Sequence, residues 1–481
     1  MFLGLIPSQI YSKHQKRPED FSRNRKLSFS KLITFILSIT SSGKSKGVDS
    51  KSGEFFRNAR RSGLWPDAKA IHRSSLTKAR KKVPWEVFEE LHSDAVDLAY
   101  EMWPEESYGI DSVADNGAYT YKGMSVFGFD GSKFMLPATP ELREEFDPGS
   151  GLENEGRGHY PQCLVNVAYD VFRRLPVAQT VVGINGSERE EAKKLICKIP
   201  PGNLLMFDRG YPSFEFFKYL NENYEGFYLF RSPASGSFKA VTEFIKSKKK
   251  EDVIWLKPPV SYLSKYNSTS TAQERKTVSP LELRVVRLQG PDGKLSVILT
   301  NLMNKKKFPR EEIINLYFRR WEIESFYRDE KVYLGVDTFH SRVSNGIRQE
   351  LFAALVMSVI ARTMMVIALP PSPSTAFFPV PQEQNQVGEN VESKSEVEVT
   401  VTIPLPQFKN AVITLAAEAA ILTPDNAELA VEIFKEVITE IRRVKYYRPI
   451  TPQPSKPRIN KHPPNKWTER KSKRKKRGCN A

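Results

Sequence analysis

A chain of 481 residues that carries 73 Lys and Arg against 56 Asp and Glu has a formal net charge of +17. Hydrophobic residues make up 40% of it, enough for a sizeable core, which excludes a wholly disordered chain. The length allows about two to four domains. The excess of positive charge favours a polyanionic partner, with nucleic acid ahead of an anionic membrane surface.

Residues 20–105 are expected to form a helical domain. Apolar residues recur at helical spacing in 27–39 and 83–99, and two short basic segments lie between them. Short helices rich in Arg and Lys are typical of small DNA-binding domains, although a helical bundle with a charged exterior has the same pattern. The side chains expected to contact DNA are Arg57, Arg60, Arg61, Arg73, Lys78 and Arg80.

Residues 120–368 are expected to form an α/β domain, because short apolar runs alternate there with helical segments. The predicted strands are 124–130, 132–136, 163–171, 203–208 and 226–231, the first two joined by a tight turn at Asp130-Gly131-Ser132. The predicted helices are 188–197, 214–221, 310–329 and 348–368. Apolar runs with polar turns in about 236–300 indicate a β-rich insertion.

The remaining segments differ in composition from this domain. Residues 370–400 begin with a stretch rich in Pro, Ser, Gln and Glu and are predicted to be a linker or an insertion. Residues 405–447 are predicted to hold two C-terminal helices. Residues 450–481 are predicted to be a disordered basic tail, because 456–477 contain eleven Lys or Arg and one acid, 11 − 1 = +10.

Several classes of protein and site are not indicated. The three cysteines are too few and too scattered for a disulfide framework or a CxxC metal site. The first 13 residues lack the pattern of a signal peptide, and 351–369 is interrupted by Arg362, so a buried helix is expected there and no membrane. No P-loop, HExxH, GxSxG or dinucleotide-binding motif is present.

Two acidic residues stand at the ends of predicted strands. Asp130 and Asp208 each follow an apolar run and each precede a glycine within two residues. Active sites of open α/β sheets form at the carboxyl ends of strands, so both are site candidates. A single strand-end aspartate more commonly caps a turn.

A third acid lies on the predicted helix 310–329. At about 100° per residue, Tyr317, Arg320, Glu324 and Lys331 fall within about 60° of one another and share one helical face. Such a face places a carboxylate among cationic groups that grip phosphate, although a solvated face with salt bridges has the same pattern.

The three acids together suit a hard divalent cation. Three carboxylates without a His or Cys set favour Mg²⁺ or Mn²⁺ over zinc. Two such ions, roughly 3.5–4 Å apart, activate a water or a 3′-hydroxyl and stabilise the leaving oxygen in an in-line phosphoryl displacement.

The spacing Tyr317-x2-Arg320-x3-Glu324-x6-Lys331 resembles the Y-R-E-K signature of the DDE transposases of bacterial insertion sequences. Three further segments resemble that family. They are Phe129-Asp130-Gly131-Ser132, Met206-Phe207-Asp208-Arg209-Gly210-Tyr211, and 335–342 after the signature. The likeness covers about residues 20–345, and 408–467 more weakly.

The resemblance implies an RNase H-like catalytic core with a β-rich insertion and an N-terminal all-helical DNA-binding domain. It implies that Asp130, Asp208 and Glu324 form the catalytic triad that binds two Mg²⁺ (or Mn²⁺) ions, and that Tyr317, Arg320 and Lys331 contact DNA phosphates. The implied reaction is cut-and-paste transposition. A homodimer on double-stranded DNA would bind terminal inverted repeats, cleave them and join them to target DNA, in the bacterial cytoplasm at the nucleoid.

Two alternatives remain at this point. The first is a catalytically inactive DNA-binding protein descended from a transposase, which the unusual segment 370–394 would suit if it disrupts the core. The second is an RNase H-like nuclease that hydrolyses DNA without joining it. All three acids and the whole signature are present, which favours an active enzyme.

Overall fold

The computed structural model describes residues 27–41, 47–104, 119–150, 159–234, 238–269, 278–289, 295–335, 338–369 and 405–446, together with parts of 2–21. The predicted linker 370–400 therefore lies outside the described residues, and so does the predicted tail 450–481.

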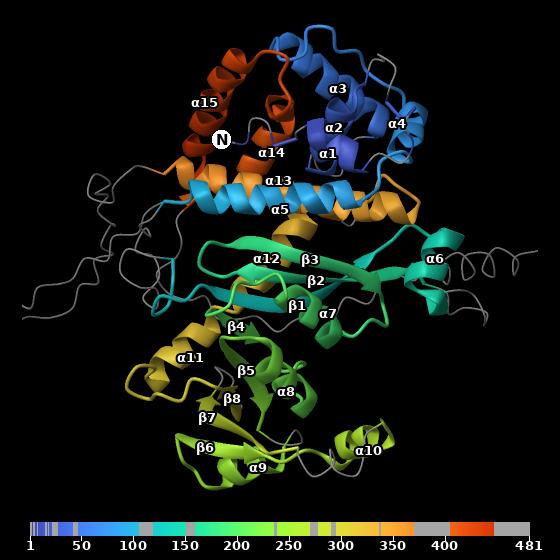
Figure 1. Ribbon diagram of the computed structural model, residues 1–481. Helices are drawn as coiled ribbons and strands as arrows, with labels where there is room; N and C mark the ends of the chain where they lie inside the picture. The colour runs from blue at the N-terminus through green and yellow to red at the C-terminus, as the bar shows by residue number, and fades with distance from the viewer. Residues whose placement is uncertain are drawn as a thin grey trace, which may run out of the picture.

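Helices from both ends of the chain pack together on one side of the sheet, in an assembly that we call the helical layer (Figure 1). The N-terminal helices are α1 (Ser8–His14), α2 (Phe29–Ser41), α3 (Val48–Arg61), α4 (Arg73–Arg80) and α5 (Glu86–Met102). The C-terminal helices are α13 (Ser344–Ile367), α14 (Phe408–Ala417) and α15 (Ala427–Arg443), with a short 3-10 helix at Ala419–Leu422 and a two-strand pairing of β9 (Leu405–Pro406) with β10 (Lys445–Tyr446). Because α2 packs on both α13 and α14, the two ends of the chain share one hydrophobic core.

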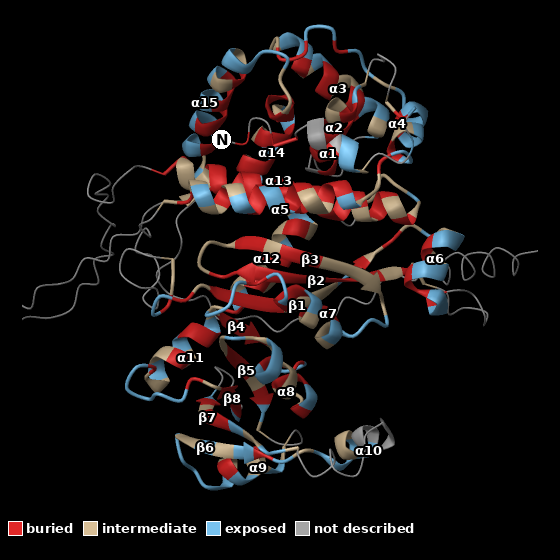
Figure 2. Cartoon of the chain, in the orientation of Figure 1, coloured by how far each residue is buried: buried red, intermediate tan, exposed pale blue. Residues whose placement is uncertain are grey.

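Helix α13 is the centre of this layer. It is the one helix in the described part of the chain that is long and apolar enough to span a bilayer, with a mean hydropathy of 1.9, and 83% of that apolar window is buried inside the protein. Figure 2 shows it almost wholly buried between α5, α14 and the sheet. The prediction of a buried helix here is confirmed.

Below the helices lies an eight-stranded sheet in the order β3-β2-β1-β4-β5-β8-β7-β6 (Figure 1). The strands are β1 (Val126–Met135), β2 (Gln162–Asp170), β3 (Leu175–Gly183), β4 (Leu204–Phe207), β5 (Phe227–Pro233), β6 (Glu251–Leu256), β7 (Leu281–Gln289) and β8 (Leu295–Thr300). Strands β1 to β3 are antiparallel, β4 and β5 run parallel to β1, and β8, β7 and β6 continue antiparallel from β5.

The two faces of the sheet are covered by different helices. Along β1, Phe127 and Phe129 pack with α7 (Glu188–Ile196) and α8 (Phe214–Asn223), whereas Val126 faces the core of the helical layer. This alternation follows from the two-residue period of a strand. Helix α12 (Trp321–Asp329) packs on β1 from the second face. The remaining helices are α6 (Pro140–Phe146), a 3-10 turn at Pro148–Ser150, α9 (Lys239–Lys246), α10 (Val260–Thr269), α11 (Arg310–Phe318) and a π-helical turn at Glu330–Leu334.

The prediction of two strands joined at Asp130-Gly131-Ser132 is wrong. Residues Val126–Met135 form one continuous strand, because Gly131 and Ser132 pair in register with residues of β2 instead of turning. Asp130 therefore lies within a strand and not at its end.

The single helix predicted at 310–329 is also wrong. It is divided into α11 and α12, and the N–H groups of Arg319, Arg320, Glu322 and Ile323 bond to carbonyls three residues earlier, which tightens the chain at the division. No Pro or Gly marks this position, so hydrophobic spacing alone does not reveal it.

Candidate active site

Asp130 and Asp208 come from neighbouring strands. Strand β1 runs parallel to β4 with Phe129 opposite Phe207, so Asp130 and Asp208 are the next residues on each side. Strand β4 ends at Phe207 while β1 continues to Met135. Asp130 and Asp208 thus lie at the carboxyl end of β4, where β1 continues without a neighbouring strand on that side in the part of the chain that the structure describes. Active sites of α/β sheets form at the carboxyl ends of strands.

A tight turn fixes the backbone around Asp208. Its Oδ1 accepts a hydrogen bond of 2.6 Å from the N–H of Gly210. A methyl group added to Gly210 would lie 3.1 Å from the same oxygen, which explains why a glycine suits this position. The carbonyl of Gly210 accepts a bond of 2.8 Å from Arg189 on α7.

Helices α11 and α12 are fastened to the same two strands. The hydroxyl of Tyr317 donates to the carbonyl of Phe207 at 3.2 Å, directly before Asp208. The hydroxyl of Tyr327 donates to the carbonyl of Asp130 at 2.9 Å. The ammonium of Lys331 donates to Ser132 at 2.7 Å and to the carbonyl of Lys133 at 2.8 Å. The helix that carries Glu324 is therefore held against the strands that carry the two aspartates.

Arg320 and Glu324 form an ion pair. Arg320 Nη2 lies 2.7 Å from Glu324 Oε1, and the Arg320 side chain is only 8% exposed. Tyr317 is 3% exposed, and burial raises the pKa of its hydroxyl to about 12. The structure thus places Tyr317 against the end of β4 and Lys331 against β1, and it pairs Glu324 with Arg320, while Tyr317 and Arg320 are mostly covered.

The electrostatics around Asp130 favour a cation. The pKa of Asp130 is raised to about 7, mainly by burial. The charges of Asp208 and Glu188 also raise it, whereas the Arg320 guanidinium lowers it. Carboxylates that repel one another in this way gain from a divalent cation between them, and oxygen donors are what Mg²⁺ and Mn²⁺ prefer. Within the described ranges, no three His, Cys, Asp or Glu side chains are grouped closely enough to hold a metal ion by themselves.

A family model of the transposase DDE domain matches residues 123–360, which contain β1, β4 and the two helices of the signature. The chain belongs to the DDE transposases. Members of this family generally use a divalent metal ion.

Relatives of the transposase come from several bacteria. It is 25% identical over 249 residues to transposase InsG for insertion sequence element IS4 of Escherichia coli strain K12, which covers 51% of this chain and 53% of that protein. It is 34% identical over 79 residues to a probable transposase for insertion sequence element IS5377 of Geobacillus stearothermophilus, 16% of this chain and 20% of that protein. The transposase spans about half the length of the first relative and a fifth of the second.

A solved structure was also matched. The piggyBac transposase in its synaptic complex with hairpin DNA aligns with a TM-score of 0.40 and 11% sequence identity, covering 91% of this chain and 84% of that one.

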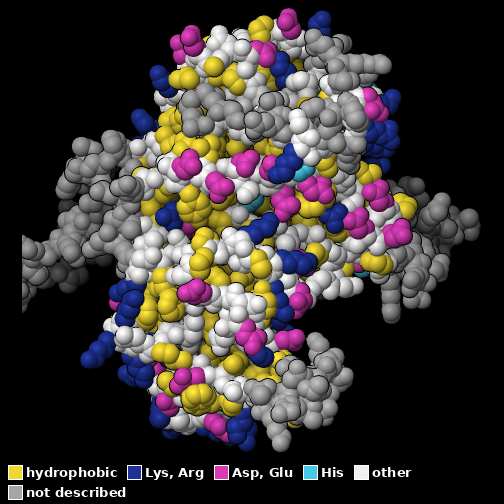
Figure 3. Space-filling model, viewed as in Figure 1, with side chains coloured by type: hydrophobic (Ala, Val, Ile, Leu, Met, Phe, Trp, Pro, Cys, Tyr) yellow, Lys and Arg dark blue, Asp and Glu magenta, His cyan; other side chains and the backbone are white. Residues whose placement is uncertain are grey.

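Most of the predicted DNA-contacting residues lie on the outside of the transposase. Arg57, Arg60 and Arg61 are exposed on α3, and Arg73 and Lys78 are exposed on α4. Figure 3 shows Lys and Arg side chains gathered at the edge of the helical layer, beside α4. Arg60 donates to the carbonyl of Ala68 at 3.0 Å, and Arg73 lies 3.9 Å from Asp49.

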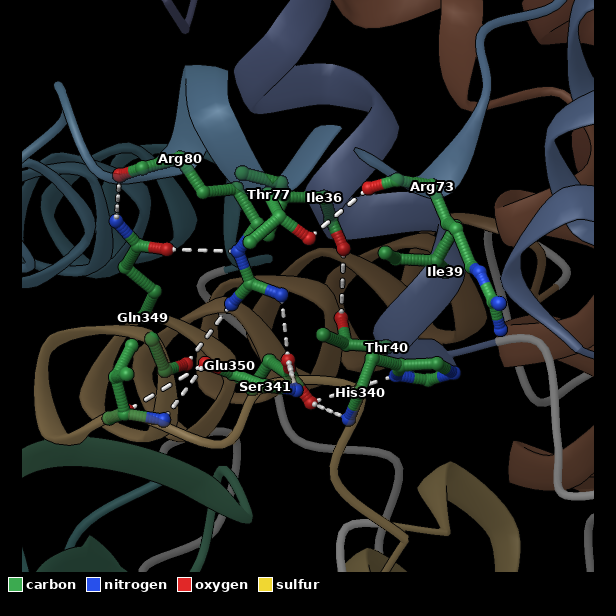
Figure 4. A network of polar contacts seen from close by, with 12 residues as sticks. Ile36, Ile39, Thr40, Arg73, Thr77, Arg80, His340, Ser341, Gln349 and Glu350 are labelled. Atoms are coloured by element: carbon green, nitrogen blue, oxygen red, sulfur yellow. Dashed lines mark hydrogen bonds and ion pairs between the residues drawn. The ribbon is translucent and has the colours of Figure 1, made fainter. Parts of the chain in front are cut away.

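Arg80 does not share this position, and its predicted contact with DNA needs correction. The residue is 6% exposed, and its guanidinium points into the layer. It donates to Gln349 at 2.9 Å, to Glu350 at 2.7 Å and to the carbonyl of Gly346 at 2.9 Å (Figure 4). Because all three nitrogens are used within the protein, Arg80 joins α4 to α13 instead of facing a partner.

Sequence reasoning missed two residues of the site. Tyr327 bonds the Asp130 carbonyl, yet it reads in the sequence as one more apolar residue of the helix. Glu188 raises the pKa of Asp130, yet it reads as an ordinary acid in the first turn of a helix. Only the placement of α7 beside β1 reveals it.

Replacing Asp130 with Asn should stabilise the metal-free protein at pH 8. The pKa of Asp130 is raised from 3.8 to about 7 in the fold, so its contribution to stability is complete below pH 3.8 and is lost as the pH rises through 7. Asparagine does not titrate. We expect the variant to exceed the wild type by at least about 1 kcal/mol in free energy of unfolding at pH 8 and to match it near pH 4. Urea unfolding in a chelator measures both values, and a wild type at least as stable as the variant at pH 8 contradicts the expectation.

Proposed function

We propose that this transposase binds the terminal inverted repeats of an insertion sequence and carries out Mg²⁺-dependent strand cleavage and strand transfer by a cut-and-paste route. One observation supports this most strongly. Helix α12 carries Glu324, and its Tyr327 bonds to the strand that carries Asp130, as does Lys331 in the turn that follows the helix. That strand is paired with the one that leads to Asp208.

The proposed catalytic core is RNase H-like and extends over residues 120–368. It consists of the mixed arrangement β3-β2-β1-β4-β5 with helices on both faces and the acids at its centre. The proposed insertion, about 236–300, adds β6 to β8 at the edge of β5 together with α9 and α10. Residues 20–105 are the proposed DNA-binding domain, and 405–447 are the C-terminal helices that pack with it.

Asp130, Asp208 and Glu324 would hold two Mg²⁺ or Mn²⁺ ions, whose chemistry is to activate the attacking hydroxyl and to stabilise the leaving oxygen. In the protein without DNA, Arg320 forms an ion pair with one carboxylate oxygen of Glu324. A phosphate that takes over the Arg320 guanidinium would release Glu324 for the site, because Arg binds phosphate well. Lys331, in the π-helical turn that follows this helix, would bind a neighbouring phosphate. Tyr317 would position Asp208 through its hydrogen bond to the carbonyl of Phe207 at the end of β4.

The direct test is a cleavage assay on the element's own ends. The purified full-length protein is incubated with a labelled duplex that contains a terminal inverted repeat, a target plasmid and Mg²⁺. We expect a cut at the end of the repeat and joining of that end to the plasmid. Binding without cleavage would instead support a DNA-binding protein that has lost its activity, and cleavage without joining would support a nuclease.

Helix α4 is proposed to contact the phosphates of double-stranded DNA. The double variant Arg73→Ala/Lys78→Ala should bind terminal-repeat DNA more weakly, and the slope of log K against log salt should become less steep by about 1 for each phosphate that the variant no longer neutralises. Fluorescence anisotropy over a range of salt measures both quantities. Lys435→Ala removes an exposed lysine from α15 in the same helical layer and serves as the control. Equal affinity and slope in the double variant and the control exclude α4 from the interface.

The oligomer on DNA is proposed to be a homodimer, because two ends must be cut and each end needs an active site. The proposed place of action is the bacterial cytoplasm at the nucleoid, where the DNA lies.

A further inference from the structure

A fourth carboxylate, that of Glu188, lies near two of the three proposed triad residues, Asp130 and Asp208. Glu188 is the first residue of α7, which packs against β1, β2 and β3. The side chain of Ser187 caps this helix by accepting from the N–H of Glu190, so the position of Glu188 at the helix start is fixed. Helix α7 and helix α12 are on opposite faces of the sheet, and Glu188 therefore approaches β1 from the side that Glu324 does not occupy.

Gly131, the residue after Asp130, shows how close Glu188 comes. A methyl group built on Gly131 would lie 2.8 Å from Oε1 of Glu188 and 2.8 Å from Oδ1 of Asn166. The two oxygens thus converge over the backbone of Gly131, in space that any larger side chain would fill. Because Gly131 has no side chain, it leaves room for these oxygen atoms.

Asn166 gives a second, independent indication. It lies on β2 opposite Gly131 and is 1% exposed. Its Oδ1 accepts no hydrogen bond in the described structure, although its Nδ2 lies 3.5 Å from the hydroxyl of Thr180. A buried oxygen acceptor without a partner is unfavourable, so an oxygen in this position is suited to a cation or to a water bound by one.

The charges around Glu188 are not balanced. Its carboxylate has no ion-pair partner among the residues that the structure describes. Burial raises the pKa of Glu188, and the charge of Asp208 raises it further, while Lys133 and Arg189 lower it. Asp130, Asp208 and Glu188 thus repel one another, and Arg320 is already paired with Glu324.

We propose that Glu188 supplies a further carboxylate oxygen to the divalent cation held by Asp130 and Asp208, with the amide oxygen of Asn166 beside it. The proposal rests on the proposed function, because it takes the metal site of that function as given. The first residue of α7 would then belong to the metal site, and the cation would have carboxylate ligands from both faces of the sheet.

The test measures Mn²⁺ binding to the full-length protein by calorimetry, without DNA. Glu188→Gln should weaken Mn²⁺ binding by at least about 10-fold. Glu190→Gln is the matched control, because it removes the same charge from the same turn of α7 at an exposed position paired with Lys193. The control should bind Mn²⁺ as the wild type does.

Thermal melting gives a second readout. Without metal, Glu188→Gln should melt at a higher temperature than the wild type, since one of three repelling carboxylates is gone. With saturating Mn²⁺, it should gain less than the wild type, because stabilisation by a ligand follows its affinity. A carboxylate that only supported the fold would lower the melting temperature both with and without Mn²⁺.

The outcomes separate the two proposals. If Asp130→Asn loses Mn²⁺ binding while Glu188→Gln binds like the wild type, the inference about Glu188 is wrong and the proposed metal site stands. If neither variant changes Mn²⁺ binding, the metal site of the proposed function is wrong, and the inference fails with it. Weaker binding in Glu188→Gln and unchanged binding in Glu190→Gln support the inference.

Discussion

Replacing Asp208 with Asn should abolish cleavage of terminal-repeat DNA in Mg²⁺ while leaving DNA binding largely intact. The proposed triad acts only by holding cations, and an amide neither carries the charge nor offers the second oxygen that a carboxylate does. We expect the cleavage rate to fall by at least about 10³-fold, which corresponds to roughly 4 kcal/mol of transition-state stabilisation. Asp130→Asn and Glu324→Gln should have the same effect.

The fold should survive these substitutions. The turn at Asp208 depends on Oδ1, which accepts from the N–H of Gly210, and asparagine keeps an oxygen in that position. Glu322→Gln, on the same helix as Glu324 but paired with Arg174 at 3.4 Å, is the matched control and should cleave DNA normally. Cleavage is measured with a labelled duplex and binding by gel shift. A wild-type cleavage rate in any of the three variants would show that the residue is not part of the triad.

Replacing Arg80 with Met should destabilise the protein by about 3–5 kcal/mol in free energy of unfolding. The ion pair of Arg80 and Glu350 is buried, with side chains 8% and 4% exposed. Burial alone would raise the pKa of Glu350, but the Arg80 charge and the hydrogen bonds from His340 lower it to about 2. Without Arg80 that carboxylate would be left buried and ionised, which is the costly case.

Chemical unfolding at pH 7 measures this effect. Lys78→Met, an exposed position on the same helix, is the control and should change the free energy of unfolding by less than about 0.5 kcal/mol. The double variant Arg80→Met/Glu350→Gln should recover part of the loss, because the unpaired charge is gone. An Arg80→Met protein as stable as the Lys78→Met control would contradict the structural role of Arg80.

The same ion pair predicts sensitivity to acid. Because the pKa of Glu350 is lower in the fold than its ordinary value of 4.5, its contribution to stability is complete above that value and is lost as the pH falls through 2.

Long periodic segments were predictable from the sequence. The helices at 188–197 and 214–221 and the strands at 163–171 and 226–231 are observed within about two residues of their predicted bounds, because their apolar spacing is regular. Strand β3 was not predicted. Pro176 argues against a strand interior, but β3 is at the edge of the sheet, where a missing N–H is tolerated.

The candidate site was predictable in its residues but not in its arrangement. The spacing of Tyr317, Arg320, Glu324 and Lys331 identified the signature, yet it assumed one straight helix, and the chain is divided after Arg319. Burial was also beyond the sequence. Arg80 and Lys78 lie in the same basic segment of the sequence. Only the packing of α4 against α13 shows that the Arg80 side chain is buried while that of Lys78 is exposed. The approach of Glu188 to Gly131 depends in the same way on contacts between distant segments.

The central claim is that Asp130, Asp208 and Glu324 hold divalent cations. The most direct measurement is an anomalous difference map from a crystal of the full-length protein bound to terminal-repeat DNA and soaked in Mn²⁺. The account predicts Mn²⁺ within coordination distance of the carboxylates of Asp130 and Asp208, with Glu324 turned away from Arg320 and toward the metal. Mn²⁺ bound only elsewhere, or Glu324 still paired with Arg320 beside an empty site, would contradict it.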